Sequence, residues 1–199
     1  LIRIKYIQDT LNKKKLNKLK ILDLGCGGGL VSEGIAKLGA DVTGIDFIEE
    51  NIRVAKKHAK QSKLEINYIV KDFEKERLTS KYDVIIIFEV LEHLENWKSF
   101  LEKIQKNLKP KGVLIASTIN RNLISKFLTI DLAENLLKWI PLNTHNYYKF
   151  IKPEELKDNL TANNFKKIEF SGLSYNIFKQ KWKMNNNKKV NYFCSSFLN

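Results

Sequence analysis

Two acids and a histidine lie close together in the stretch EVLEH, as Glu89, Glu92 and His93. On one helical turn this E-x-x-E-H spacing places both acids on one face, with His93 beside them. Carboxylates and an imidazole that converge in this way suit a divalent cation. The start of a helix, where the dipole stabilises acids, explains the spacing equally well. His93 is also a candidate general base for a mechanism without metal.

A second motif is the run of four glycines in ILDLGCGGGL, residues 21–30. Glycines between a strand and a helix let the backbone approach a nucleotide-like ligand at the helix N-terminus, which makes Gly25 and Gly27 candidate cofactor contacts. A tight turn that needs positive φ is the alternative explanation. The spacing reads G-x-G-x-x-L, ending at Leu30, so it lacks the last glycine of a dinucleotide fingerprint and disfavours NAD.

Acidic residues beside the glycines narrow the choice of ligand. Asp46 follows Gly25 by 21 residues (46 − 25) and ends a predicted strand, where a carboxylate can accept hydrogen bonds from both ribose hydroxyls. Asp23 lies within the strand before the glycines and suits a cationic group better than a pyrophosphate. S-adenosylmethionine carries a ribose, an ammonium and a sulfonium, so it is the cofactor that we expect.

These residues require elements that bring them to one place. Apolar runs predict strands over 20–25, 40–46, 64–70, 82–90 and 113–119, and helical patterns alternate with them over 30–39, 49–62 and 97–112. Strands that alternate with helices indicate an α/β fold with a doubly wound parallel sheet. Such sheets bind ligands at the carboxyl ends of their strands, where the glycines and EVLEH both fall.

Composition sets further limits. A chain of 199 residues with 43% hydrophobic residues predicts a single domain over 1–199. The net charge of +13 invites a nucleic-acid or membrane partner, but the lysines are spread along the chain and are better explained as solvated faces. Cys26 and Cys194 lack the spacing of a disulfide or zinc framework, which fits a cytoplasmic setting. The sequence has no apolar run of the ~20 residues that span a bilayer.

The motifs together resemble a known family. DLGCGGG with GID is similar to the class I S-adenosylmethionine-dependent methyltransferases. RIKYI, FEVLEHLENW, the long stretch from STINRN to KPEEL and the tail VNYF resemble the ubiquinone biosynthesis O-methyltransferases (the UbiG family). The resemblance implies a Rossmann-like, mostly parallel seven-stranded sheet. It also implies a lead-in of roughly 40 residues that this sequence lacks.

Several site residues rest on this resemblance. It implies that Arg3, Gly25, Asp46 and Phe88 line the cofactor site. Asp72 is a candidate for the adenine amino group, with a solvated loop as the alternative. The resemblance also favours the metal interpretation of Glu89, Glu92 and His93, with magnesium as the expected ion. His145, in NTHNYY, is a second catalytic candidate, although this chain has Asn146 where the family tends to have an acid.

The implied reaction is methyl transfer from S-adenosylmethionine to a ring hydroxyl of a polyprenylated phenol or demethylubiquinol, at one or both O-methylation steps of ubiquinone synthesis. A phenol with a pKa of ~10 is ionised about one part in a thousand at pH 7, a deficit of roughly 4 kcal/mol that a metal could reduce. The alternatives are another small-molecule acceptor and a non-catalytic scaffold that binds the cofactor. No nucleic-acid substrate is expected.

The stretch at about 121–150 is a predicted helical insertion, with an apolar face over 122–142 beside lysines. Core packing would explain such a face. Because the implied substrate has a polyprenyl tail, we expect instead a lid that touches an anionic bilayer, peripherally on the inner face of the membrane. Other ubiquinone-synthesis enzymes are expected partners.

Overall fold

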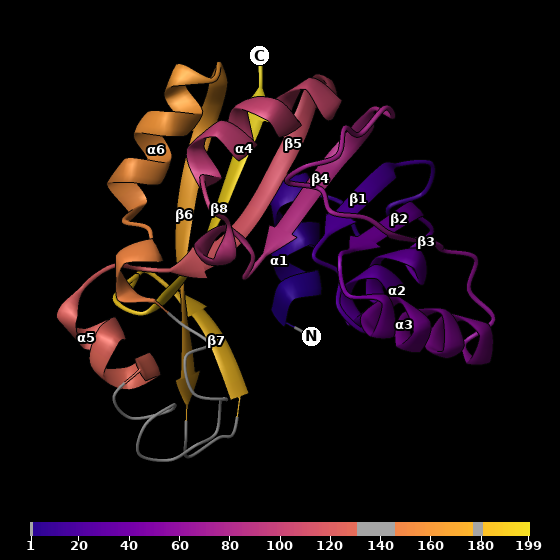
Figure 1. The fold of residues 1–199 in the computed structure, drawn as a ribbon, viewed down its shortest axis with the longest axis horizontal. Coiled ribbons are helices and arrows are strands. Elements are labelled where there is room, and N and C mark those ends of the chain that lie inside the picture. Colours follow the sequence, from indigo (N-terminus) through magenta and orange to yellow (C-terminus); the bar gives the residue numbers. More distant parts are fainter. Residues whose placement is uncertain (1, 131–145, 177–180) are drawn as a thin grey trace.

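A central sheet organises the structure, a computed structural model that describes residues 2–130, 146–176 and 181–199 (Figure 1). In the described residues eight strands pair in the order β3-β2-β1-β4-β5-β8-β6-β7. The strands are β1 (Lys20–Leu24), β2 (Asp41–Asp46), β3 (Asn67–Val70), β4 (Tyr82–Phe88), β5 (Leu108–Ile119), β6 (Phe165–Asn176), β7 (Lys181–Asn185) and β8 (Asn191–Leu198).

Helices cover both faces of the sheet (Figure 1). They are α1 (Ile2–Leu11), α2 (Leu30–Ala36), α3 (Glu49–Gln61), α4 (Trp97–Ile104), α5 (Leu123–Lys126) and α6 (Pro153–Ala162), with 3₁₀ turns at Leu91–His93, Gln105–Asn107 and Tyr147–Lys149. One apolar cluster joins α4 and α6 to the sheet, and a second joins α1 and α2 to its other face. Alternate residues of β4 supply the two clusters, so this strand is buried on both faces, as its continuous apolar sequence predicts.

The direction of the strands confirms the predicted fold class. From β3 to β5 all neighbours are parallel, whereas β8 runs antiparallel between β5 and β6. The sheet has one strand more than the seven expected. This strand, β7, pairs with β6 as an edge hairpin, and the polar sequence KWKMN has no buried apolar face that could have revealed it.

The predicted boundary between the helix over 97–112 and the strand that follows it is wrong. The helix expected over 97–112 ends at Ile104, and β5 already begins at Leu108. Pro110 and Gly112, which predict a helix stop, instead lie inside the strand, next to a register irregularity between β4 and β5. Proline is tolerated in a strand at such an irregularity because no ladder hydrogen bond is needed there.

The predicted insertion is described in part. Asn122 caps α5 by accepting hydrogen bonds from the backbone N–H groups of Ile124 and Ser125, and a π-helical turn follows at 127–130. Leu123 and Phe127 are exposed by 77% and 57%, so this part of the apolar face does not pack in the core. In the described part of the chain, no helix is long and apolar enough to cross a membrane.

Candidate active site

The glycine turn begins directly after β1. Gly25 and Gly27 have φ of 69° and 51°, values that side chains rarely adopt. A Cβ on Gly25 would lie 2.3 Å from Cγ2 of Val90, whereas a Cβ on Gly27 would meet nothing within 4 Å. The turn alone therefore requires glycine at both positions, and Gly27 in addition leaves open space in which a ligand can approach the backbone.

Asp46, at the end of β2, holds this turn in place. Its Oδ2 accepts a hydrogen bond from the N–H of Gly27 at 2.9 Å. Its Oδ1 accepts from the N–H of Ile48 at 2.9 Å and from the Asn51 amide at 3.2 Å. A carboxylate offers about four lone-pair directions, so about one remains for a ligand. A ribose that used both oxygens would have to replace one of the protein donors.

Asp23 lies inside β1 and is 2% exposed. The hydroxyl of Ser32, on α2, donates a hydrogen bond of 2.6 Å to its Oδ2. Burial raises the pKa of Asp23 to about 6, against the opposing effects of the Ser32 hydrogen bond and the Arg3 charge. A ligand cation beside Asp23 would favour the ionised form of its carboxyl group. The predicted contact with an ammonium group requires this ionised form.

Arg3 and Phe88 meet although they are far apart in the sequence. The guanidinium carbon of Arg3 lies 5.6 Å from the centre of the Phe88 ring, a cation–π distance. Phe193 of β8 packs against Phe88 at 5.6 Å between ring centres, and Tyr6 of α1 stacks on Phe193 at 4.4 Å. This aromatic stack fixes α1, and with it Arg3, at the carboxyl end of β4.

Asp72 has a local structural role. It accepts hydrogen bonds from the N–H groups of Glu74 and Lys75, and it forms an exposed ion pair with the Lys75 side chain. The hydrogen bond from Lys75 lowers the pKa of Asp72. The solvated-loop alternative accounts for all of these contacts, so the adenine contact stays a prediction.

Glu89 follows β4 in an unusual backbone conformation. Its φ of 55° lies in the left-handed region, which costs a residue other than glycine about 1–3 kcal/mol. The strained backbone is held by a 3.0 Å hydrogen bond from the Glu89 N–H to the carbonyl of Ser117. Ser117 also donates its hydroxyl to Oε1 of Glu89 at 2.5 Å, and the Asn191 amide donates to Oε2 at 3.2 Å.

Glu92 is buried close enough to Glu89 to feel its charge, and it is 3% exposed. The Thr118 hydroxyl donates to its Oε2 at 2.7 Å, while its Oε1, also buried, accepts no hydrogen bond. Burial, together with the nearby charge of Glu89, raises the pKa of Glu92 well above its usual value. Either a shared proton or a bound cation would reduce the repulsion between the carboxyl groups of Glu89 and Glu92. Because hard divalent ions prefer carboxylate oxygens, this acid pair fits such an ion.

The predicted set of three metal ligands is not assembled. Residues 91–93 form a 3₁₀ turn rather than the expected α-helix, and the His93 side chain faces outward and is exposed. The 3₁₀ turn begins at Leu91, so Glu89, with its left-handed backbone, lies outside it, and within the turn Glu92 is buried whereas His93 is exposed. Across the described ranges, no three side chains of His, Cys, Asp or Glu are grouped so that they could hold a metal ion.

The second catalytic candidate, His145, lies outside the described residues.

Three polar side chains that hold the acid pair of Glu89 and Glu92 were not predicted from the sequence. They are Ser117, Thr118 and Asn191. Ser117 and Thr118 are 1% and 0% exposed in a strand that is otherwise apolar at its carboxyl end. Two hydroxyls in such a strand were the available signal, because buried polar groups need partners.

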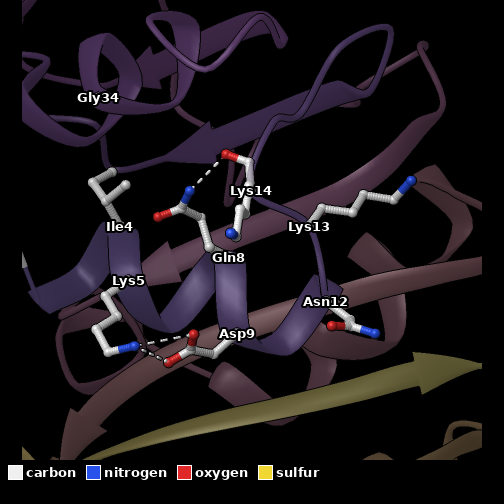
Figure 2. A pocket seen from close by; sticks show the side chains of 8 residues that line it. All are labelled: Ile4, Lys5, Gln8, Asp9, Asn12, Lys13, Lys14 and Gly34. Atoms are coloured by element: carbon white, nitrogen blue, oxygen red, sulfur yellow. Dashed lines mark hydrogen bonds and ion pairs between the residues drawn. The ribbon is translucent and has the colours of Figure 1, made fainter.

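A pocket of about 760 Å³ lies elsewhere, between α1, the segment after it and Gly34 of α2 (Figure 2). Within it Lys5 pairs with Asp9, and the Gln8 amide donates to the carbonyl of Lys14. None of the predicted site residues lines it. The close packing of Ile4 on Gly34, where a Cβ would lie 2.6 Å from Cδ1, helps to position the helix that carries Arg3.

Solved structures share this fold. The magnesium protoporphyrin IX methyltransferase of Synechocystis PCC 6803, determined with bound SAH, superimposes with a TM-score of 0.72 at 19% identity, over 99% of this chain and 80% of that one. A plantazolicin methyltransferase gives a TM-score of 0.70 at 24% identity, over 99% and 82%. The fold is therefore that of the class I methyltransferases, and residues 15–190 match the family model described as a methyltransferase domain.

Relatives with curated names define the family of this chain more narrowly than the fold does. The ubiquinone biosynthesis O-methyltransferase of Rickettsia canadensis (strain McKiel) is 42% identical over 194 residues, which cover 96% of this chain and 82% of that protein. The enzyme of the same name from Pelagibacter ubique (strain HTCC1062) is 41% identical, over 100% and 86%. The chain belongs to the ubiquinone biosynthesis O-methyltransferase family.

Proposed function

We propose that the protein transfers a methyl group from S-adenosylmethionine to a ring hydroxyl of a polyprenylated phenol or demethylubiquinol in ubiquinone synthesis. The observation that carries the proposal is the contact between the two turns of the site. Gly25 directly follows β1 and Val90 follows Glu89, and these two residues pack directly against each other. A methyl donor on the glycine turn would thus lie beside an acceptor held at the acid pair. Membership of the family supports the class of acceptor.

The donor would be held by groups of both signs. Asp23 suits the ammonium group, Arg3 the carboxylate, and Asp46 a ribose hydroxyl, while Gly27 leaves the backbone accessible. The Phe88 ring lies 5.6 Å from the guanidinium carbon of Arg3, so cation–π attraction helps to position this side chain. This placement would hold the donor beside the acceptor, and such positioning can supply a large part of the rate enhancement of a two-substrate displacement.

The reaction is an in-line displacement. The acceptor oxygen forms a bond to the methyl carbon while the carbon–sulfur bond breaks, and its electron pair stays on sulfur. The acceptor proton passes to the carboxylate of Glu89, which Ser117 and Asn191 orient. Since a phenol is mostly protonated at neutral pH, a base within reach offsets part of the roughly 4 kcal/mol deficit. His93 and His145 stay predictions for this role.

A divalent cation is the second part of the proposal. The partnerless Oε1 of Glu92 and the carboxylate of Glu89 would hold it, and magnesium suits two carboxylates with water in its remaining positions. When bound, such an ion lowers the pKa of a phenolic oxygen that it contacts. His93 would complete the ligand set only if its side chain turned inward.

We further propose that the insertion contacts an anionic membrane surface at the inner face, where the polyprenyl tail and other enzymes of the pathway would be found. Leu123, Ile124 and Phe127 are exposed beside Lys126. A depression of about 980 Å³ lies between α5 and residues 186–189, which add Lys188 and Lys189. Apolar side chains flanked by lysines are typical of interfacial binding.

The test is methyl transfer from labelled S-adenosylmethionine to a short-tailed demethylubiquinol and to a polyprenylated phenol, with magnesium and then with a chelator. Turnover of both acceptors supports both O-methylation steps. Turnover that the chelator abolishes supports the cation, and turnover that resists the chelator assigns the proton transfer to the chain's own base. Cofactor binding without turnover of either acceptor contradicts the proposed function.

A further inference from the structure

Asn191 contacts the acid pair from a distant part of the sequence. It is the first residue of β8, and its backbone lies opposite Ile119 of β5 and Leu173 of β6. Its side-chain amide donates to Oε2 of Glu89 at 3.2 Å. The Ser117 hydroxyl donates to the other oxygen, Oε1, at 2.5 Å. Each oxygen of the Glu89 carboxylate is thus held by a donor from a different strand.

The packing and backbone pairing of β8 do not require an asparagine at position 191. The residues after it, Tyr192, Phe193 and Cys194, are buried, as expected for a central strand, and asparagine is disfavoured in strands. Backbone pairing on both sides needs no side-chain amide. The amide is directed at a carboxylate, and a hydrogen bond to a charged group is stronger than one between neutral groups.

The position of Asn191 is itself fixed. The amide groups of Asn120 and Asn122 donate to the carbonyls of Lys188 and Lys189, each at 2.7 Å, and the N–H of Asn120 donates to the carbonyl of Val190 at 2.7 Å. The segment that leads into Asn191 is therefore tied to the residues that leave β5. The segment that directly follows the strand of Ser117 thus anchors the approach to Asn191.

We infer that Asn191 is a positioning residue, which holds the Glu89 carboxylate in the orientation required by the acceptor hydroxyl. The inference rests on the proposed function, and it holds whether Glu89 takes up the proton or binds a cation. A glutamate side chain has three rotatable bonds, and the strained backbone of Glu89 directs but does not fix its carboxylate. The hydrogen bonds from Ser117 and Asn191 together fix it.

The test compares Asn191→Ala and Asn191→Asp with Asn185→Ala. Asn185 is a matched control because it is also half-buried and donates its amide at 2.6 Å to Ser174, away from the acid pair. For Asn191→Ala we expect kcat to fall about 10- to 100-fold, with KM and the Kd of S-adenosylhomocysteine changed by less than about threefold. Asn191→Asp should be slower still, because a second carboxylate repels Glu89. Asn185→Ala should keep the wild-type kcat.

Crystal structures of the wild type and of Asn191→Ala provide a readout that does not need turnover. We expect the Glu89 carboxylate to leave the Ser117 hydroxyl or to occupy several rotamers in the variant. An unmoved Glu89 with wild-type kcat, or a loss of kcat in Asn185→Ala equal to that in Asn191→Ala, would overturn the inference. If the wild type itself turns over neither acceptor, the proposed function fails, and the crystal structures still decide the role of Asn191.

Discussion

Gly25 and Val90 lie in direct contact at the carboxyl ends of two adjacent strands, with no room for a Cβ between them. The contact joins the cofactor turn after β1 to the turn that carries Glu89 and Glu92. Any side chain at position 25 must therefore separate the two halves of the site as well as adopt an unfavourable φ.

We expect Gly25→Ala to lower the free energy of unfolding by about 1–3 kcal/mol and to weaken binding of S-adenosylhomocysteine by tenfold or more. Titration calorimetry and thermal denaturation measure the two effects. Gly28→Ala is the control, because a Cβ there would meet only Cγ1 of Val54, at an ordinary 3.6 Å. Equal affinities for Gly25→Ala and the wild type would show that the turns do not need this contact.

The pKa of Asp23 predicts how cofactor affinity depends on pH. Burial raises the pKa of Asp23 from 3.8 to about 6 in the free protein, and a ligand ammonium favours the ionised form. The Kd of the cofactor should therefore rise as pH falls below about 6, by up to about tenfold per pH unit. Calorimetric titrations between pH 5 and 8 measure this, and Asp23→Asn should remove the dependence. A Kd that is constant over this range would exclude Asp23 as the ammonium contact.

Ionisation of Asp23, which favours cofactor binding, should lower the free energy of unfolding of the free protein. The folded pKa is raised above the unfolded one, so the stabilisation is fully present below about pH 3.8 and is lost as pH rises to about 6. The difference of 2.2 units (6 − 3.8) corresponds to about 3 kcal/mol. Denaturant titrations of the wild type and Asp23→Asn should therefore converge at low pH and separate between pH 4 and 6. Parallel curves would contradict this.

Magnesium should stabilise the protein through the acid pair. At ten times the Kd, binding adds about 1.4 kcal/mol, or roughly 3–6 °C in Tm for a chain of this size. Thermal denaturation should show this shift in the wild type but not in Glu92→Gln, which removes a charge and keeps the shape. If neither protein responds to magnesium or to a chelator, the carboxyl pair holds a proton instead of a cation.

Membrane binding should depend on α5 and on the turn that follows it. Burial of a Leu or Phe side chain contributes about 1.5–3 kcal/mol, so we expect Leu123→Asp with Phe127→Asp to reduce partitioning into vesicles by more than about tenfold. Flotation with anionic and with neutral vesicles measures this, and Lys188→Gln with Lys189→Gln should affect only the anionic case. Trp182→Ala is the control for an exposed aromatic elsewhere. Absence of wild-type binding to either vesicle would end the membrane proposal.

The ion pair between Arg121 and Glu155 joins the start of the insertion to α6, the helix that follows it. The guanidinium of Arg121 contacts the Glu155 carboxylate and donates to the carbonyl of Tyr148, and both charged side chains are about one third exposed. After allowance for solvent screening, Arg121→Ala should cost about 1 kcal/mol, or roughly 2–4 °C in Tm. Lys5→Ala, which breaks an exposed pair with Asp9, should leave Tm unchanged. Equal Tm values for Arg121→Ala and the wild type would show that the pair contributes nothing.

Much of the fold can be predicted from local sequence. The run of residues 84–88 is apolar because β4 is buried on both faces, and the glycines follow β1 because the turn there needs positive φ. The edge strand β7 could not be predicted, since its largely polar sequence lacks the apolar alternation that marks a strand. The start of β5 was missed because Pro110 and Gly112 also end helices.

Only those parts of the site that lie within one segment of the sequence could be predicted. Glu89 and Glu92 lie in the same short segment after β4, but the left-handed backbone of Glu89 and the 3₁₀ turn that leaves His93 exposed are not encoded by the residue types. Asn191 lies about a hundred positions from Glu89, and only the pairing of β5 with β8 brings the two together.

The stacking of Tyr6 on Phe193 has a consequence for the order of events during synthesis. Arg3 precedes all of the described strands in the sequence, but the aromatic rings that support it include one from β8, which lies in the sheet between β5 and β6. A nascent chain that lacks β8 has the glycine turn and α1 but no completed support for Arg3. We therefore expect tight binding of the cofactor only after β8 has joined the sheet.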